Sequence, residues 1–192
     1  MKNVDKNKRI CPVELAWGID NVFRKWLHNP DKILKNYVKD GMTVLDVGCG
    51  PGLFSIEIAA MVGKNGKVIA ADLQEGMLEK LKNKIRGKEI ESRIEVHKST
   101  NNRIGVTEKI DFVLAFYMVH EVSDKVGFFR EIKSILKPGG RVFVIEPKFH
   151  VSKNDFEETL KIAREAGLKP YKRENVFFSR AMVLANENNY NR

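Results

Sequence analysis

Long hydrophobic runs are absent from the sequence, and cysteine is scarce. No stretch approaches the roughly 18 uncharged residues that a membrane span requires, and the N-terminal MKNVDKNKRI has no apolar core behind its charges. Cys11 and Cys49 have no CxxC pair or histidine cluster beside them, which excludes a disulfide framework and a zinc site but leaves one disulfide open. Free thiols are typical of a reducing compartment, so we expect a cytoplasmic protein without membrane attachment.

Concentrated charge is also absent. The 192 residues include 34 Lys and Arg against 25 Asp and Glu, and the net charge of +9 is spread along the chain without a run of five like charges. No basic stretch is interleaved with aromatic residues, so the charge pattern does not favour a nucleic-acid partner. With 43% hydrophobic residues, the chain has enough apolar material for a single packed core and too much for a disordered protein.

Short apolar runs alternate along the chain with segments of helical spacing. Thr43–Val47 is apolar and ends in glycines, and Gly52–Val62 repeats apolar residues at the spacing of a helix face. Further predicted strands are Lys67–Ala71, Ile94–His97, Ile110–Phe116, Arg141–Ile145, Leu168–Phe178 and Ala181–Ala185. Further predicted helices contain Met77–Ile85, Val126–Leu136 and Phe156–Ala163, and the last is closed by Gly167.

This alternation predicts an α/β fold with a doubly wound, mostly parallel sheet of seven strands. The last two strands are joined by only a few residues, too few for a crossover, so the C-terminal strand is expected to be antiparallel. The arrangement is Rossmann-like, and ligands of such sheets bind beyond the carboxyl ends of the strands.

Residues 1–40 precede the first predicted strand and form a helical segment of their own. Its aromatic residues are Trp17, Phe23, Trp26 and Tyr37. These side chains either cover an edge of the sheet or form a lid over the ligand site. We therefore divide the chain into this segment, expected to be a substrate lid, and a single core domain at residues 41–192.

The most informative motif is VLDVGCGPG, where a predicted strand runs into closely spaced glycines. Gly48, Gly50 and Gly52 allow a tight turn and a close approach of the backbone to a ligand at the start of the next helix. Asp46 precedes them and would repel the pyrophosphate of a dinucleotide. A ligand with a cationic amine and no phosphate suits this loop better.

A second acid, Asp72, ends the next predicted strand. A carboxylate at this place can accept hydrogen bonds from both hydroxyls of a ribose, which indicates an adenosine-like ligand. The apolar Leu73 and Met77 follow it and could pack on an adenine ring, although the helical spacing of Met77 equally fits a core residue.

Four segments in order, VLDVGCGPG, VIAADLQEGML, DFVLAFYMVHEV and LKPGGRVFVIEP, resemble the successive motifs of class I S-adenosylmethionine-dependent methyltransferases. The resemblance covers roughly residues 42–147 and implies S-adenosyl-L-methionine as cofactor and S-adenosyl-L-homocysteine as product. It implies that the glycine loop wraps the methionine part of the cofactor, with Asp46 close to it, and that Asp72 binds the ribose. The remaining residues expected at the cofactor are Cys49 in the loop, Leu73, Met77, Ala115, Phe116, and Ser99 in place of an acid that many members carry.

Methyl transfer from a sulfonium is an in-line displacement, so a base is needed only when the acceptor arrives protonated. His120 is the candidate base, because it follows the fourth predicted strand and its ordinary pKa suits proton transfer near neutral pH. His120-Glu121 also falls where the small-molecule O-methyltransferases of plants carry a catalytic His-Asp. A structural or substrate-shaping role for His120 is the alternative, and Tyr117 either lines the pocket or caps the sheet.

The acceptor is expected to be a small, partly apolar molecule. FYMV at residues 116–119 stands where nucleic-acid amino-methyltransferases carry an Asn- or Asp-Pro-Pro-aromatic motif, which argues against base amines as acceptors. Glu121 and Asp124 have no recognisable metal-ligand pattern, so no metal is expected. The alternatives are a methyltransferase acting on RNA or protein, an NAD(P)-dependent dehydrogenase, and a non-catalytic cofactor-binding module. The sequence is compatible with a monomer or a homodimer.

Overall fold

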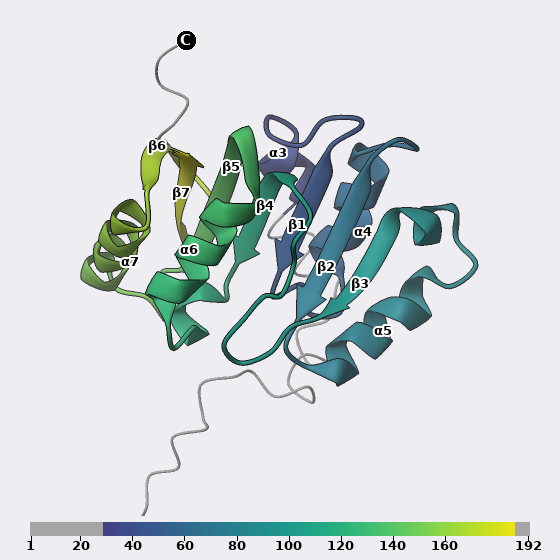
Figure 1. Cartoon of the computed structure of the whole chain (residues 1–192), viewed down its shortest axis with the longest axis horizontal. Helices are drawn as coiled ribbons and strands as arrows, with labels where there is room; N and C mark the ends of the chain where they lie inside the picture. Colours follow the sequence, from purple (N-terminus) through teal and green to yellow (C-terminus); the bar gives the residue numbers. More distant parts are fainter. Residues whose placement is uncertain (1–28, 187–192) are drawn as a thin grey trace, which may run out of the picture.

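The computed structural model describes residues 29–186, in which seven strands form one sheet between two layers of helices (Figure 1). The strands are β1 (Thr43–Val47), β2 (Lys67–Asp72), β3 (Ile94–Lys98), β4 (Ile110–Phe116), β5 (Leu136–Pro147), β6 (Leu168–Glu174) and β7 (Ser179–Asn186). The helices are α3 (Pro30–Leu34), α4 (Leu53–Met61), α5 (Glu75–Ile85), α6 (Lys125–Ile135) and α7 (Lys153–Glu165), with short 3₁₀ turns at Glu89–Arg93 and Val119–Glu121.

The strand order is β3-β2-β1-β4-β5-β7-β6, and the pairs β3/β2, β2/β1, β1/β4 and β4/β5 are parallel. β7 is antiparallel to both of its neighbours, β5 and β6. The predicted α/β fold with a doubly wound, mostly parallel seven-stranded sheet and an antiparallel C-terminal strand is confirmed. The order of the hairpin strands was not predicted: the last strand lies inside the sheet, between β5 and β6.

Some predicted boundaries were wrong. The α6 helix ends at Ile135, and the Lys-Pro-Gly-Gly stretch that follows is already part of β5. Gly139 has φ +80°, and the pairing of β4 with β5 shifts register between Ile110 and Phe112, so the strand begins irregularly. β6 stops at Glu174, and the residues after it form the tip of the hairpin.

Two apolar layers hold the helices against the sheet. The face toward α6 and α7 is lined by alternate strand residues such as Val113 and Val144, which pack on Phe129 and Phe156. The other face packs on α3, α4 and α5 through side chains such as Phe112. Figure 1 shows α6 in front of the sheet and α4 behind it.

Most of the predicted lid segment, including Trp17, Phe23 and Trp26, lies outside the described residues. Tyr37 is described: its ring packs on Phe112 and Phe143, and its hydroxyl donates a hydrogen bond to Glu174. This bond joins the chain before β1 to the end of β6. Among residues 29–186, no helix is long and apolar enough to cross a membrane.

Candidate active site

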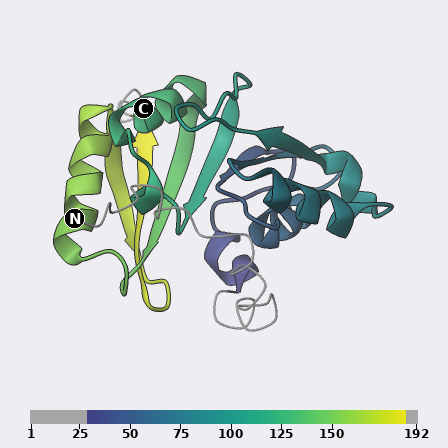
Figure 2. The same cartoon turned by 90° about the horizontal axis from the view of Figure 1, so that it is seen from below.

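The carboxyl ends of β1, β2 and β4 lie side by side, because β1 pairs with the other two strands in parallel. They meet at the lower edge of the sheet in Figure 1, and Figure 2 views the molecule from that side. The chain leaves β1 toward the β2 side and leaves β4 toward the β5 side, so this edge is a topological switch point. Ligands of open α/β sheets bind at such points.

The glycine loop after β1 has left-handed backbone at Gly48 (φ +71°), Gly50 (φ +54°) and Gly52 (φ +83°). A Cβ at Gly52 would lie 2.3 Å from Cδ1 of Leu81, and a Cβ at Gly48 would lie 2.9 Å from Cβ of Met118. A Cβ at Gly50 would meet nothing within 4 Å. Two of the glycines are therefore required for packing, whereas Gly50 borders open space that a ligand could fill.

Asp72 connects this loop to the end of β2. Its Oδ2 accepts a hydrogen bond of 2.8 Å from the amide of Gly50, and its Oδ1 accepts one of 2.8 Å from the amide of Gln74. A carboxylate has about four lone-pair positions, so two remain for other donors. The structure thus places Asp72 directly beside the glycine loop.

Asp46 is only 2% exposed and points to α4, where the hydroxyl of Ser55 donates a hydrogen bond of 2.6 Å to its Oδ2. Burial raises the pKa of Asp46 to about 7, although the Ser55 hydrogen bond opposes the rise. Cys49 is a free, buried thiol whose pKa burial raises well above its ordinary value. The thiol is therefore a poor nucleophile.

The residues expected around an adenine ring lie after β2 and β3. Leu73 is half-buried and Met77 is buried at the start of α5. Ser99 is held against β2, because its amide donates to the carbonyl of Asp72 at 3.0 Å. Its hydroxyl already donates to the carbonyl of Ile104 at 3.2 Å, which leaves only its lone pairs for a ligand.

The end of β4 brings Ala115, Phe116 and Tyr117 to the same edge. Ala115 is fully buried. The ring centroid of Phe116 lies 4.1 Å from that of Tyr117 and 4.4 Å from that of Phe54 in α4. Tyr117 has φ +57°, which is rare for a residue with a bulky side chain, and its hydroxyl lies 2.6 Å from Oγ of Ser179. This bond ties the end of β4 to β7.

His120 is held by Glu146, a residue that was missed as a site residue in the sequence. Nδ1 of His120 lies 2.5 Å from Oε2 of Glu146, and Oε1 accepts from the amides of Val119, at 2.8 Å, and His120, at 3.3 Å. This hydrogen bond raises the pKa of His120 above its ordinary value, against the opposing effect of partial burial. The sequence signal for Glu146 was its position at the end of the VFVIEP strand, because neighbouring parallel strands end at the same edge of the sheet.

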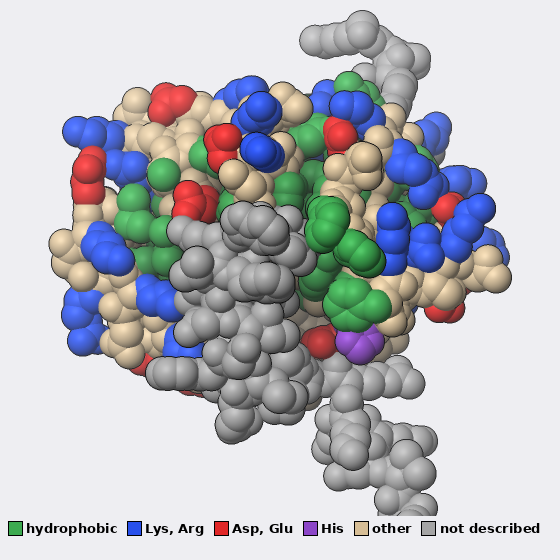
Figure 3. Space-filling view, turned by 180° about the vertical axis from the view of Figure 1, so that it is seen from behind, with side chains coloured by type: hydrophobic (Ala, Val, Ile, Leu, Met, Phe, Trp, Pro, Cys, Tyr) green, Lys and Arg blue, Asp and Glu red, His purple; other side chains and the backbone are tan. Residues whose placement is uncertain are grey.

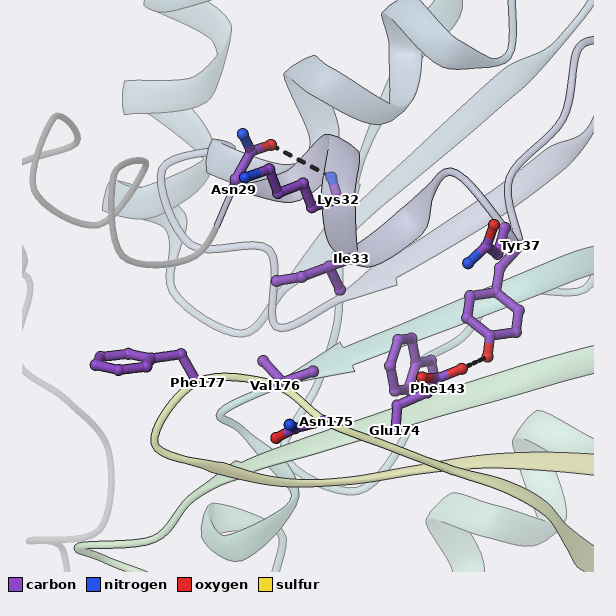
Figure 4. Close-up of a pocket in the computed structure, with 10 residues that line it drawn as sticks. Asn29, Lys32, Ile33, Tyr37, Phe143, Glu174, Asn175, Val176 and Phe177 are labelled. Carbon is purple, nitrogen blue, oxygen red and sulfur yellow. Dashed lines mark hydrogen bonds between the residues drawn. The ribbon is translucent and has the colours of Figure 1, made fainter.

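The cavity in Figure 4 lies apart from the glycine loop. It has a volume of about 260 Å³ and lies between α3 and the chain that follows β6, lined among others by Lys32, Tyr37, Glu174 and Phe177. None of its lining residues belongs to the glycine loop. Within residues 29–186, no group of three or more His, Cys, Asp or Glu residues could hold a metal ion.

Comparison with known proteins identifies the family. Residues 38–177 match the family model described as a methyltransferase domain. The crystal structure of a SAM-dependent methyltransferase from Aquifex aeolicus is 30% identical, with a TM-score of 0.80, and the match covers 91% of this chain and 98% of that one. The chain therefore belongs to the methyltransferase-domain family, which confirms the resemblance to methyltransferases.

Curated relatives are similar over part of their length. The demethylmenaquinone methyltransferase of Lactobacillus johnsonii is 33% identical over 133 residues, which is 69% of this chain and 52% of that protein. The ubiquinone/menaquinone biosynthesis C-methyltransferase UbiE of Haemophilus ducreyi is 29% identical over 133 residues, 69% of this chain and 49% of that protein. The chain thus spans about half the length of these relatives.

Proposed function

We propose that this protein transfers a methyl group from S-adenosylmethionine to a small, partly apolar acceptor, with His120 as general base. The observation that carries the proposal is that the glycine loop and the His120–Glu146 pair meet at one edge of the sheet. Met118, two residues before His120, lies against Gly48 of the loop. A methyl donor on the loop and an acceptor at the histidine would therefore be neighbours.

The residues present fit this cofactor. A ligand could occupy the open space beside Gly50. The lone pairs of Asp72 that accept no backbone hydrogen bond suit two ribose hydroxyls. Gly48, Cys49 and Gly52 would complete the loop, and the backbone around Ala115 and Phe116 would meet the amino group of the cofactor. Leu73, Met77 and Ser99 are proposed to line the adenine site.

Asp46 would act on the cofactor through its charge. It is buried and its side chain already accepts from Ser55, so we assign it no direct contact with the ligand. A nearby cation favours the ionised carboxylate and would lower the pKa of Asp46 from about 7. Cationic ligands are thereby preferred over the anionic pyrophosphate of a dinucleotide.

When bound, S-adenosylmethionine supplies an electrophilic methyl group on a positively charged sulfur. The chain has to align the acceptor with that methyl group and exclude water. His120 presents Nε2 as its proton-accepting atom, because Nδ1 is directed at Glu146. The buried carboxylate stabilises the imidazolium that forms when His120 removes the acceptor proton.

Two observations favour a small acceptor. The relatives from Lactobacillus johnsonii and Haemophilus ducreyi are named for demethylmenaquinone and ubiquinone/menaquinone, which are small molecules. Near His120, the ring centroid of His150 lies 5.9 Å from that of His120, and His150 in turn contacts Phe149, which is apolar and exposed. RNA or protein remains the second candidate, and only the net charge of +9 favours it.

The test is to incubate the protein with methyl-labelled S-adenosylmethionine and a cell extract, and then to separate small molecules, RNA and protein before counting. The proposal expects label in the small-molecule fraction. Label in RNA or protein would overturn the acceptor class and retain the methyltransferase. Transfer to RNA should also fall steeply as salt is raised, because phosphate contacts are screened.

A further inference from the structure

Three exposed phenylalanine residues lie just after β5 and at the tip of the β6–β7 hairpin. They are Phe149, Phe177 and Phe178, with exposed fractions of 71%, 55% and 61%, and we call them the phenylalanine patch. Among residues 29–186, the only other large hydrophobic residue that is exposed is Tyr171. Figure 3 shows hydrophobic side chains gathered on one face of the molecule, with a histidine and several Lys and Arg side chains beside them. Apolar side chains that cluster on a surface in this way mark an interaction site.

The fold places the two parts of the patch side by side. β5 pairs with β7 as far as Pro147, which lies opposite Ser179. The amide of Lys148 then donates a hydrogen bond of 3.0 Å to the carbonyl of Phe178, and Phe149 follows directly in the chain. The patch is therefore carried by two adjacent turns at the carboxyl edge of the sheet.

The backbone at Phe178 is unfavourable for a phenylalanine. Its φ of +49° lies in the left-handed region, where turns commonly carry glycine or asparagine. Burial in the protein offsets little of this cost, because the residue is exposed. Backbone strain of this kind concentrates at functional sites. The strained hairpin tip is therefore a second indication that the patch has a partner outside the protein.

Two lysine residues flank the patch. Lys148 is bonded to Phe178 through its backbone amide, and Lys32 of α3 lines the same cavity as Phe177 (Figure 4). Both lysines are exposed, and in the part of the chain that the structure describes neither ammonium group is paired with a carboxylate. Their charges are therefore available to an external anion.

The other charges near the patch do not cancel these lysines. Glu174 ends β6 just before the hairpin tip, and its carboxylate is bonded to Lys172 at 2.7 Å and to the hydroxyl of Tyr37. Arg180 follows the tip in β7, and its Nε donates a hydrogen bond of 3.0 Å to the carbonyl of Val151. The surroundings of the patch therefore carry an excess of positive charge, which is complementary to an anionic surface.

We infer that the phenylalanine patch docks this protein on an anionic lipid bilayer. Apolar rings that border lysine residues suit a membrane surface, because the rings enter the boundary of headgroups and acyl chains while the lysines attract acidic lipids. Rings on the ends of two turns can enter this boundary without a matching cavity, whereas a protein partner has to supply a complementary surface. The glycine loop and His120 lie at the same edge of the sheet and would then face the bilayer.

This inference goes beyond the proposed function, because docking requires neither a methyl donor nor an acceptor. The sequence alone predicted no membrane attachment, since it contains no long apolar run. A patch that is built from two turns, distant from each other in the chain, leaves no such run. Docking at a bilayer surface also requires no spanning helix, and residues 29–186 contain none.

The test measures co-sedimentation of the full chain with vesicles of phosphatidylcholine alone and of phosphatidylcholine mixed with phosphatidylglycerol. One variant combines Phe149→Ala with Phe178→Ala, which removes two exposed rings that are not part of the core. A second variant, Lys148→Gln, removes one positive charge and leaves the rings in place. The thermal unfolding of each variant is compared with that of the wild type, so that a folding defect is recognised.

Two matched controls lie outside the patch. Tyr171→Ala removes an exposed aromatic ring that packs on Arg141 of β5. Lys88→Gln removes an exposed positive charge at the opposite edge of the sheet, since Lys88 precedes the 3₁₀ turn that leads into the start of β3. Both variants should bind vesicles within about twofold of the wild type, because charges far from the bilayer are screened.

We expect the wild type to bind the mixed vesicles, and to bind phosphatidylcholine alone at least about tenfold more weakly. The double phenylalanine variant should bind the mixed vesicles at least about tenfold more weakly than the wild type, because two rings no longer leave water. Lys148→Gln should weaken binding about fivefold, which corresponds to about 1 kcal/mol per lysine at an anionic surface, and the difference should vanish at high salt.

The inference is wrong if the wild type does not bind the mixed vesicles, or if the double variant binds them as tightly as the wild type. It is also wrong if neither protein binds vesicles and the wild type forms a dimer in sedimentation velocity that the double variant does not form. The patch is then an interface between two copies of the chain. The proposed function would stand in each case, because vesicle binding and methyl transfer are measured separately.

Discussion

Nδ1 of His120 lies 2.5 Å from Oε2 of Glu146, a carboxylate that is only 1% exposed. The pair joins the turn after β4 to the end of β5. Because the remaining ring nitrogen is Nε2, the carboxylate sets both the orientation of the imidazole and the atom that can accept a proton. The proposed chemistry therefore depends on a residue that need not contact the acceptor.

Replacement of Glu146 by Gln should change the pH dependence of the reaction. Glu146 raises the pKa of His120, so its loss lowers that pKa and moves the acid limb of the pH–rate profile to lower pH. The plateau rate should fall by about tenfold or more, because the amide can donate to Nδ1 and favour the wrong tautomer. Glu121→Gln is the comparison: Glu121 lies 3.9 Å from Nε2 and should give a smaller shift. An unmoved acid limb in Glu146→Gln would contradict this role.

Replacement of His120 by Ala should lower turnover at least about tenfold, because the acceptor loses its base. The affinity for S-adenosylhomocysteine, measured by calorimetry, should stay within about twofold of the wild type, since the glycine loop is unchanged. The two measurements together separate a lost base from a lost cofactor site. Unchanged turnover rules out His120 as the base.

The glycine loop offers a matched pair of substitutions. Gly50 and Gly41 both have left-handed backbone, with φ +54° and φ +78°, and neither has an atom within 4 Å of an added Cβ. Each change to Ala should therefore lower the free energy of unfolding by about 1–2 kcal/mol. Only Gly50→Ala should weaken the binding of S-adenosylhomocysteine, by about tenfold or more, because its Cβ enters the space proposed for the ligand. Equal affinities in the two variants would place the ligand elsewhere.

The affinity for S-adenosylmethionine should depend on pH through Asp46. The ionised carboxylate attracts the cationic ligand and the protonated one does not, and the pKa of Asp46 in the free protein is about 7. The affinity should therefore rise as pH rises toward 7, by at most about tenfold per pH unit, and level off above it. Calorimetry between pH 5.5 and pH 8.5 measures this, and Asp46→Asn should flatten the curve. A wild-type affinity that is independent of pH would show that the charge of Asp46 does not contribute to binding of S-adenosylmethionine.

The sequence predicted those parts of the site that are local in the chain. The glycine loop, Asp72 and His120 each follow a strand that its apolar residues identify, and strand ends in a parallel sheet share one edge. The structure places Asp72 against the amide of Gly50, a contact that the motifs did not predict. The seven-strand architecture followed from the same alternation of apolar runs and helical spacing.

The unpredicted parts depend on which strands are neighbours. Glu146 is 26 residues from His120, and their contact follows from the pairing of β4 with β5, in which Phe116 lies opposite Ile145. The position of β7 inside the sheet brings Ser179 to Tyr117, and no local pattern encodes that order.

The most direct test of the central claim is a crystal structure of the protein with S-adenosylhomocysteine. The account predicts the homocysteine part against Gly48–Gly52, the ribose hydroxyls on Asp72, and the sulfur facing the side of the site where His120 lies. A ligand bound in the cavity between α3 and the chain after β6, with the glycine loop uncontacted, would contradict it.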